Sequence, residues 1–194
     1  MCIRDRNNTA TITGPYEAKG PLSKYFDKSY NDLYFDEKTW ELAESKMITE
    51  SVDLLLNKVN KTRFDIDVYI SGDLLNQIVA SNYAAVNLGI PYIGVYGACS
   101  TSVLGLIIAS NMLDASQVKS CITSTSSHNN AAEKQFRYPV EYGGPKPKTT
   151  TFTSTGAASA YLSNSKCGIK VESATLGTVL DLSLIHISEP TRPY

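Results

Sequence analysis

The chain has 194 residues, a formal net charge of −1, 42% hydrophobic and 19% charged residues. These values are typical of one globular domain with its own core. A charge so close to neutral gives no reason to expect a nucleic-acid partner. No apolar run reaches the length of a membrane-spanning helix, and the pattern of a secretory signal peptide is absent. We therefore expect neither a transmembrane segment nor a signal peptide in this chain.

The two ends of the chain differ from the rest. Residues 1–6 and 182–194 resemble translations of a sequencing adapter read from its two strands. Segments of this kind are set aside when a fold is interpreted. We expect residues 7–181 to be the natural part, a fragment cut at both ends, in which His128 is the single histidine.

Strands and helices are expected to alternate along the natural part. Apolar periodicity predicts strands at residues 9–13, 65–70, 92–96 and 118–124, and helices at residues 37–60, 76–88 and 103–112. Asp36 is the expected N-cap of the first helix, and Gly89 is the expected C-cap of the second.

Two polar segments, residues 16–36 and 126–148, are expected to be loops. The second is long enough to suggest a functional or lid-like loop. Further strands are expected at residues 150–155, 158–162 and 168–174. The alternation predicts an α/β fold with a parallel or mixed sheet and helices on its faces. Ligands of such sheets bind at the carboxyl ends of the strands.

The turn Gly97-Ala98-Cys99-Ser100-Thr101-Ser102 joins a predicted strand to a predicted helix. Backbone N–H groups and the helix dipole at this point favour a thiolate or a bound anion. Strand-to-helix turns recur as positions for nucleophiles. Cys99 is therefore a candidate nucleophile or anion-binding residue. The alternative is a small buried hydrophobic side chain, the role of most free cysteines.

Asp73 and His128 also follow predicted strands, so they should share one rim of the sheet with Cys99. Asp73 either serves the site or caps the next helix through the amide of Leu75 or Asn76. His128 either acts as a base for Cys99, binds a carboxylate, or is a hydrogen-bonded structural residue.

Arg137 is flanked by aromatic residues in Gln135-Phe136-Arg137-Tyr138-Pro139. Its guanidinium suits bidentate recognition of a carboxylate, although a packed ion pair within the loop is an equal alternative. Phosphate-binding loops, dinucleotide fingerprints and metal-ligand spacings are absent, so neither a cofactor nor a metal site is predicted. The four cysteines lack metal spacing, which favours a reducing compartment.

Several long motifs resemble a known family. They are Gly20-Pro21-Leu22, Phe26-Asp27-Lys28-Ser29-Tyr30, Gly72-Asp73-Leu74-Leu75-Asn76-Gln77, the turn around Cys99, Thr125-Ser126-Ser127-His128-Asn129, and Gln135-Phe136-Arg137-Tyr138-Pro139-Val140-Glu141-Tyr142-Gly143-Gly144. Together they resemble the stage V sporulation protein AD family over nearly all of residues 9–181.

The resemblance implies a thiolase-like fold, related to the ketoacyl synthases and built from two similar α/β halves. This chain resembles the amino-terminal half, with a mixed, mainly parallel five-stranded sheet and helices on its faces. Cys99 matches the thiolase-type nucleophile. Gly156-Ala157-Ala158 resembles a glycine-rich region of ketoacyl synthases, but Thr155 stands where an acidic residue is usual. The catalytic histidine of those enzymes belongs to the second half.

The resemblance implies a sporulation protein that binds dipicolinic acid (pyridine-2,6-dicarboxylate) and supports its uptake into the developing spore. Calcium would be carried with this ligand. Asp73, Cys99, His128 and Arg137 are the ligand-binding residues that this role suggests, with His128 protonated and Asp73 acting through His128 or through calcium. The alternative is an acyltransferase of the thiolase or ketoacyl-synthase type with Cys99 as its nucleophile.

The same resemblance implies partners and a location. The partners would be other membrane proteins of the stage V sporulation A operon, together with a second copy of the chain in a homodimer. The location would be the inner membrane of the forespore or spore, reached peripherally and without a helix of its own that crosses the bilayer.

Overall fold

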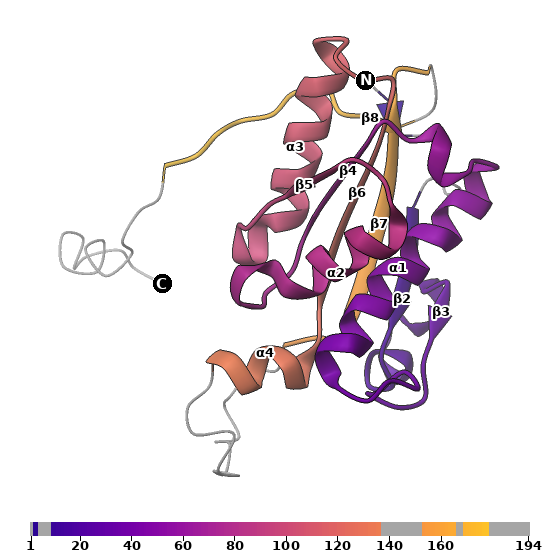
Figure 1. Cartoon of the computed structure of the whole chain (residues 1–194), viewed down its shortest axis with the longest axis vertical. Coiled ribbons are helices and arrows are strands. Elements are labelled where there is room, and N and C mark those ends of the chain that lie inside the picture. Colours follow the sequence, from indigo (N-terminus) through magenta and orange to yellow (C-terminus); the bar gives the residue numbers. More distant parts are fainter. Residues whose placement is uncertain (1, 4–8, 137–152, 166–168, 179–194) are drawn as a thin grey trace, which may run out of the picture.

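A computed structural model describes residues 2–3, 9–136, 153–165 and 169–178 (Figure 1). Its central sheet has the strand order β3-β2-β7-β6-β4-β5. These strands are β2 (Thr9–Thr13), β3 (Lys28–Ser29), β4 (Val68–Gly72), β5 (Tyr92–Gly94), β6 (Ser120–Ser127) and β7 (Gly156–Ser163). Two further short strands, β1 (Cys2–Ile3) and β8 (Ile169–Lys170), pair with each other, and β1 also pairs with β7.

The directions of the strands confirm a mixed sheet, in which parallel and antiparallel pairings are equally frequent among the five central strands. β4 runs parallel to both β5 and β6, whereas β7 runs antiparallel to β6 and to β2. Of the five central strands, β7 is therefore the one that points the opposite way. The two-residue strands β1, β3 and β8 are additional to the expected five-stranded sheet and lie at its margins.

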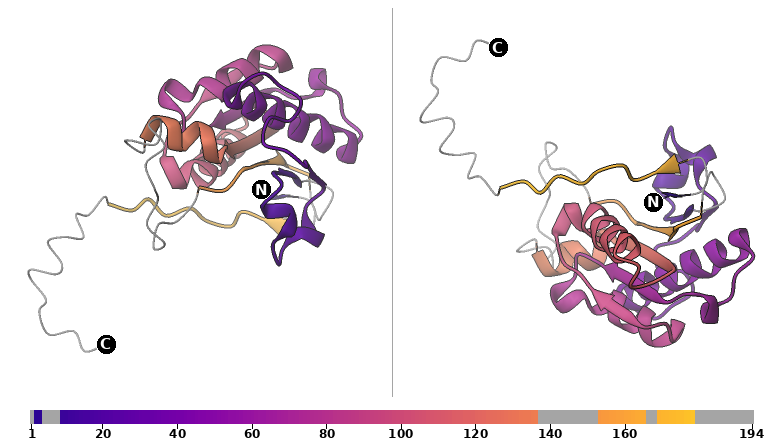
Figure 2. Two further views of the ribbon diagram at one scale, coloured as in Figure 1. Left: turned by 90° about the horizontal axis from the view of Figure 1, so that it is seen from below. Right: turned by 90° about the horizontal axis from the view of Figure 1, so that it is seen from above.

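The end of the described chain differs from the expected strands. Residues 153–155 are not a strand, and residues 150–152 lie outside the described residues. The strand expected at 168–174 is reduced to β8, because the chain after Lys170 has no regular structure. It continues to residue 178 as an extended segment that leads away from the sheet (Figure 2).

The helices are α1 (Trp40–Val59), α2 (Val79–Leu88), α3 (Thr101–Asp114) and α4 (Asn129–Phe136). Asp36 does not cap α1, because its φ of 62° puts it in the left-handed region. Thr39 has the extended backbone of an N-cap, and its side chain accepts a hydrogen bond from the Leu42 N–H. Gly89 does end α2, with a φ of 66° and an N–H that donates to Ala85.

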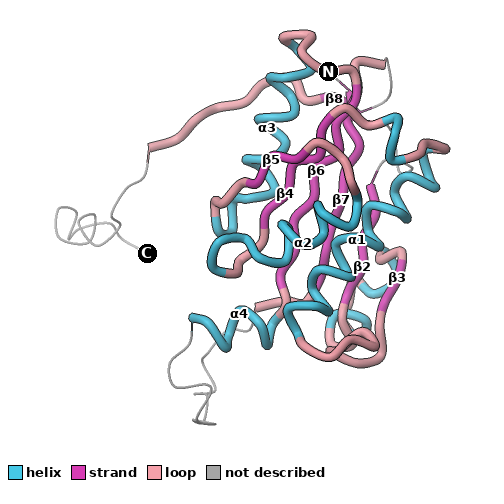
Figure 3. The backbone as a smooth tube through the Cα atoms, in the orientation of Figure 1, coloured by secondary structure: helices cyan, strands magenta, loops and turns pink. Residues whose placement is uncertain are grey.

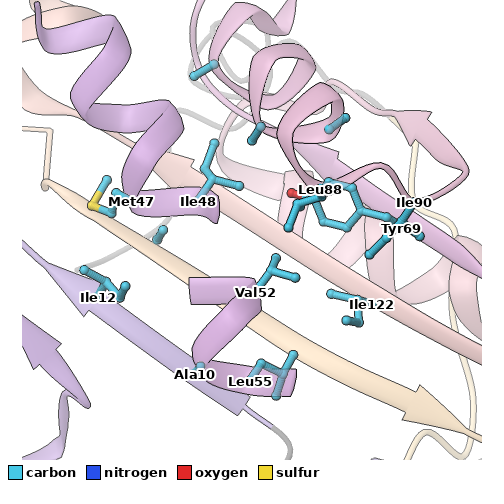
Figure 4. Close-up of a cluster of buried hydrophobic side chains, with 14 of the residues drawn as sticks. Ala10, Ile12, Met47, Ile48, Val52, Leu55, Tyr69, Leu88, Ile90 and Ile122 are labelled. Atoms are coloured by element: carbon cyan, nitrogen blue, oxygen red, sulfur yellow. The ribbon is translucent and has the colours of Figure 1, made fainter. Parts of the chain in front are cut away.

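Alternation along β4 shows which helices cover which face of the sheet. Tyr69 packs in the cluster that α1 and α2 form with the sheet, whereas Val68 and Ile70 pack with α3. Successive side chains of a strand point to opposite faces, so α1 and α2 cover one face and α3 covers the other. Figure 4 shows Ile48, Val52 and other α1 side chains packed over β2, β7 and β6. Burial of each such aliphatic side chain contributes about 1.5–3 kcal/mol.

The segment after His128, expected to be a loop, begins with helix α4, which lies beyond the carboxyl end of β6 (Figure 3). Two alanines, a glutamate, a lysine and a glutamine give this short segment adequate helix propensity despite its few apolar residues. Among the described residues, no helix has both the length and the apolar character that spanning a bilayer requires.

Candidate functional site

A cavity of about 570 Å³ opens at the rim where β2, β4 and β6 end and β7 begins. This volume is within the range of small-molecule pockets, roughly 300–1,000 Å³. Half of its lining residues carry hydroxyl groups, namely Thr11, Thr13, Thr101, Ser102, Thr125, Ser126, Ser127, Thr153 and Ser154. Asp73, Leu74, Phe26 and the turn with Cys99 complete much of the wall. The expectation that Asp73 and Cys99 share one rim is confirmed.

Cys99 lies on a single 3-10 turn, Ala98–Ser100, directly before α3. Its thiol is free and exposed. Ala98 holds a φ of 46°, an uncommon value for a residue with a side chain. The hydroxyl of Ser100 donates to Gly97 O at 2.7 Å, and the hydroxyl of Thr101 donates to Ala98 O at 2.8 Å. These bonds fix the turn and hold Cys99 at the cavity wall.

A close backbone approach joins the end of β4 to the segment that leads to Cys99. The Val95 N–H donates to Ser71 O at 2.9 Å. A Cβ placed on Gly72 would overlap the carbonyl oxygen of Val95 and lie 2.7 Å from the Thr101 methyl group. Glycine is therefore required at position 72 for the two strand ends to meet at the cavity.

The carboxylate of Asp73 borders the cavity but is only 1% exposed. Oδ1 accepts a hydrogen bond from Leu75 N at 2.8 Å, and Oδ2 accepts one from Ser81 N at 2.7 Å. Burial raises the pKa of Asp73, while these bonds act in the opposite direction. Leu75 is one of the two amides expected to donate to Asp73, but it lies before the helix. Asp73 caps α2 through the N–H of Ser81, in the first turn of that helix.

The structure does not bring His128 to the cavity wall. The side chain is buried, its Nε2 lies 2.7 Å from Leu33 O, and its Nδ1 accepts from Ala131 N at 3.4 Å. Since Nδ1 is an acceptor, Nε2 carries the proton and the ring is neutral. Burial lowers the pKa of His128. A contact between a protonated His128 and the ligand was expected. Instead, the neutral ring links the start of α4 to the loop that contains Leu33, through its bonds with Ala131 N and Leu33 O.

The other expected partners are placed as follows. Asp73 bonds to the two amides and not to His128, so it does not orient that ring. Arg137 lies outside the described residues. Within the described part of the chain, no three His, Cys, Asp or Glu side chains converge as metal ligands.

Glu44 of α1 is a feature of the site that sequence reasoning missed. Its Oε1 accepts a hydrogen bond from the hydroxyl of Ser126, a cavity residue, at 2.7 Å. Burial, aided by the negative charge of Asp73, raises the pKa of Glu44 to about 8. A signal was present in the sequence, because Glu44 lies four and eight residues before Ile48 and Val52 on the apolar side of α1.

The layered sheet, in which the turn with Cys99 leads into α3, has a thiolase-like fold. The structure of 3-oxoacyl-(acyl-carrier-protein) synthase III from Aquifex aeolicus VF5 is similar, with a TM-score of 0.56 and 17% identity over 82% of this chain and 53% of that chain. A structure of an OleA variant from Xanthomonas campestris has a TM-score of 0.53 and 18% identity over 84% of this chain and 55% of that chain. At these identities the likeness shows the fold alone.

A sequence profile of Stage V sporulation protein AD matches residues 5–190. Stage V sporulation protein AD of Bacillus subtilis (strain 168) is 45% identical over 178 residues, which cover 92% of this chain and 53% of the relative. The chain therefore belongs to the Stage V sporulation protein AD family. It spans about half the length of this curated relative.

Proposed function

We propose that the cavity bordered by Asp73 and Cys99 binds dipicolinic acid and that the protein supports the uptake of this compound into the developing spore. Family membership supports a role in sporulation, and the hydroxyl-rich cavity at the end of the sheet carries the proposal of a ligand. Dipicolinic acid is a planar aromatic dianion. It requires donors for two carboxylates and an apolar surface for its ring.

The chemistry of the cavity wall fits these requirements. Serine and threonine hydroxyls can donate to carboxylate oxygens, and the ring of Phe26 offers apolar surface. Asp73, the one carboxylate among the described residues of the wall, already accepts two backbone hydrogen bonds, which reduces its repulsion of an anion. Arg137 is the proposed bidentate partner of one ligand carboxylate, and calcium travels with the ligand as its chelate.

The proposal extends to the setting of the protein. It acts as a homodimer at the inner membrane of the forespore or spore. It is held there peripherally through other membrane proteins of the stage V sporulation A operon. Family membership supports the sporulation setting.

Titration calorimetry on the full-length protein tests the proposal. Dipicolinate is expected to bind the wild type. Cys99→Ala is expected to retain binding with reduced affinity, because Cys99 is part of the cavity wall and performs no chemistry. Cys121→Ala is a matched control, since Cys121 is buried in β6 away from the cavity. Absence of dipicolinate binding to the wild type contradicts the proposal.

The exposed thiol on a strained turn before α3 favours a second candidate, an acyltransferase with Cys99 as nucleophile. In this case an acyl-CoA or a condensing-enzyme inhibitor would form a thioester or covalent adduct at Cys99. Mass spectrometry of the full-length protein after incubation detects that adduct. Failure of any acyl group to transfer to Cys99 counts against this candidate.

A further inference from the structure

A buried acid lies directly behind the cavity wall. Ser126 lines the cavity, and its hydroxyl is 2.7 Å from Oε1 of Glu44. Glu44 itself is fully buried, and its Oε2 has no hydrogen-bond partner among the described residues. Among the described residues, the hydroxyl of Ser126 is the hydrogen-bond partner of this carboxyl group, and no ion pair to it is found.

The charges around Glu44 disfavour its ionised form. Asp73 and Glu41 both act on it as negative charges. The described strands β2, β6 and β7 and helix α2, which pack against α1, contain no Asp, Glu, Lys, Arg or His. On α4, which also packs against α1, Lys134 pairs with Glu41, and Glu133 adds another carboxyl group. His128 before α4 is neutral at its buried position.

An ionised carboxylate in such a place is costly, since it has lost water and the described part of the chain brings no cation to it. The elevated pKa of Glu44, about 8, agrees with this geometry. At neutral pH the group is therefore a carboxylic acid, which can donate a hydrogen bond as well as accept one.

The protonation state of Glu44 determines what the Ser126 hydroxyl offers to the cavity. A neutral Glu44 can donate its proton to the Ser126 oxygen, and the Ser126 O–H is then free to donate to a ligand. An ionised Glu44 only accepts, so Ser126 must donate to it and presents a lone pair to the cavity. A lone pair facing a ligand carboxylate is repulsive.

We propose that Glu44 is a positioning residue that makes Ser126 a hydrogen-bond donor to a carboxylate ligand and withdraws this donor when Glu44 loses its proton. The inference rests on the proposed function, because it takes the ligand to be a carboxylate in this cavity. It assigns a regulation to the site: binding is stronger in neutral or mildly acidic surroundings than in alkaline ones.

Titration calorimetry with dipicolinate between pH 6.5 and pH 9.5 measures the effect in the full-length protein. With a pKa of about 8, Glu44 is neutral in roughly one tenth of the molecules at pH 9. Wild-type binding is therefore expected to be about tenfold weaker at pH 9 than at pH 7. Asp73 is the other buried acid at this wall; burial raises its pKa, whereas its hydrogen bonds with the N–H groups of Leu75 and Ser81 lower it.

Glu44→Gln is the decisive variant. The glutamine amide donates to Ser126 at every pH, so binding at pH 7 should stay within about threefold of the wild type and the loss at pH 9 should disappear. Asp53→Asn is the matched control, because it removes a carboxylate from the same helix that pairs with Arg63 and does not act on Glu44, so it should keep the wild-type loss. Ser126→Ala should weaken binding at pH 7 and also abolish the pH dependence.

Two outcomes overturn the inference: a wild-type affinity that does not change between pH 7 and pH 9, or a Glu44→Gln variant that keeps the wild-type loss. A readout without ligand separates this failure from failure of the proposed function. Carbon-13 NMR of labelled glutamate should show one carboxyl group titrating near pH 8 that is absent in Glu44→Gln. Absence of dipicolinate binding contradicts the proposed function, whereas titration of Glu44 near its ordinary pKa contradicts the inference itself.

Discussion

The N–H of Ser81 donates a 2.7 Å hydrogen bond to the carboxylate of Asp73, so the residue that borders the cavity also caps the helix behind it. Asp73→Ala should lower the free energy of unfolding by about 1–3 kcal/mol, because two buried amides lose their acceptor. Asp73→Asn should cost less, since the amide oxygen keeps one of the two bonds. Urea unfolding of the full-length protein measures both, with the exposed Asp114→Ala as control. Equal stability of Asp73→Ala and the wild type contradicts this assignment.

Gly72 and Gly89 provide a pair of glycine substitutions with different physical costs. Gly72→Ala places a methyl group against Val95 O and should destabilise the protein by about 1–3 kcal/mol while disturbing the Cys99 turn. Gly89→Ala meets no atom within 4 Å, so its cost is the left-handed backbone strain of about 1 kcal/mol. Denaturant midpoints give the two stabilities. Dipicolinate affinity should fall in Gly72→Ala and stay unchanged in Gly89→Ala.

The stability of the protein should depend on pH through Glu44. Its pKa is raised from an ordinary 4.5 to about 8 in the folded state, so the folded protein binds the extra proton between these values. The stability from neutral Glu44 is complete below about pH 4.5 and is lost as the pH rises through about 8. In Glu44→Gln the free energy of unfolding should lose this slope, which is at most about 1.4 kcal/mol per pH unit. Urea unfolding at pH 5, 6.5 and 8 compares the variant with the wild type, and identical slopes refute the expectation.

Two of the cysteines should differ sharply in reactivity. Cys99 is exposed, whereas Cys121 is buried in β6 and its burial raises the pKa of that thiol to about 12. A maleimide should therefore modify Cys99 in the native protein and reach Cys121 only after denaturation. Peptide mapping by mass spectrometry reads each site separately. Dipicolinate should slow the modification of Cys99, and modification of both thiols at the same rate would contradict the described burial.

Helix α3 should make residues 7–181 poorly soluble when they are produced alone. Apolar residues lie on nearly every side of α3, yet the sheet covers only one side of the helix. Val103, for example, is 56% exposed. An uncovered apolar surface of this kind promotes association. Light scattering after gel filtration should find aggregates, and Val103→Ser should reduce them. A monodisperse monomer with a cooperative thermal melt is the opposite result.

Local patterns predicted much of the fold. The apolar spacing of α1 and the glycine at position 89 each carry their structural signal within a short stretch of chain. The rule that strand ends share a rim also brought Asp73 and Cys99 together correctly. These features depend on nearest neighbours and on the geometry common to all such sheets.

The remaining site features depend on contacts between distant segments. His128 follows a strand as expected, but its ring is buried because Nε2 is hydrogen-bonded to the carbonyl of Leu33, on a distant loop. Glu44 meets Ser126 only because α1 crosses the end of β6. The position of a residue after a strand does not show in which direction its side chain points. Likewise, a polar residue on the apolar face of a helix gives no information in the sequence about which residue it bonds.

The pairing of β2 with β7, two strands far apart in the sequence, has a consequence for the order of folding during synthesis. β2 pairs with β7 along all five of its residues. The first strand of the central sheet therefore cannot form this pairing until β7, near the end of the described chain, has been synthesised. At about 5–20 residues per second, the ribosome needs roughly 7–30 seconds to make the chain between them. During that time the edge of β2 that faces β7 has no partner, so pairing of β2 with β7 should be a late step in the folding of the nascent chain.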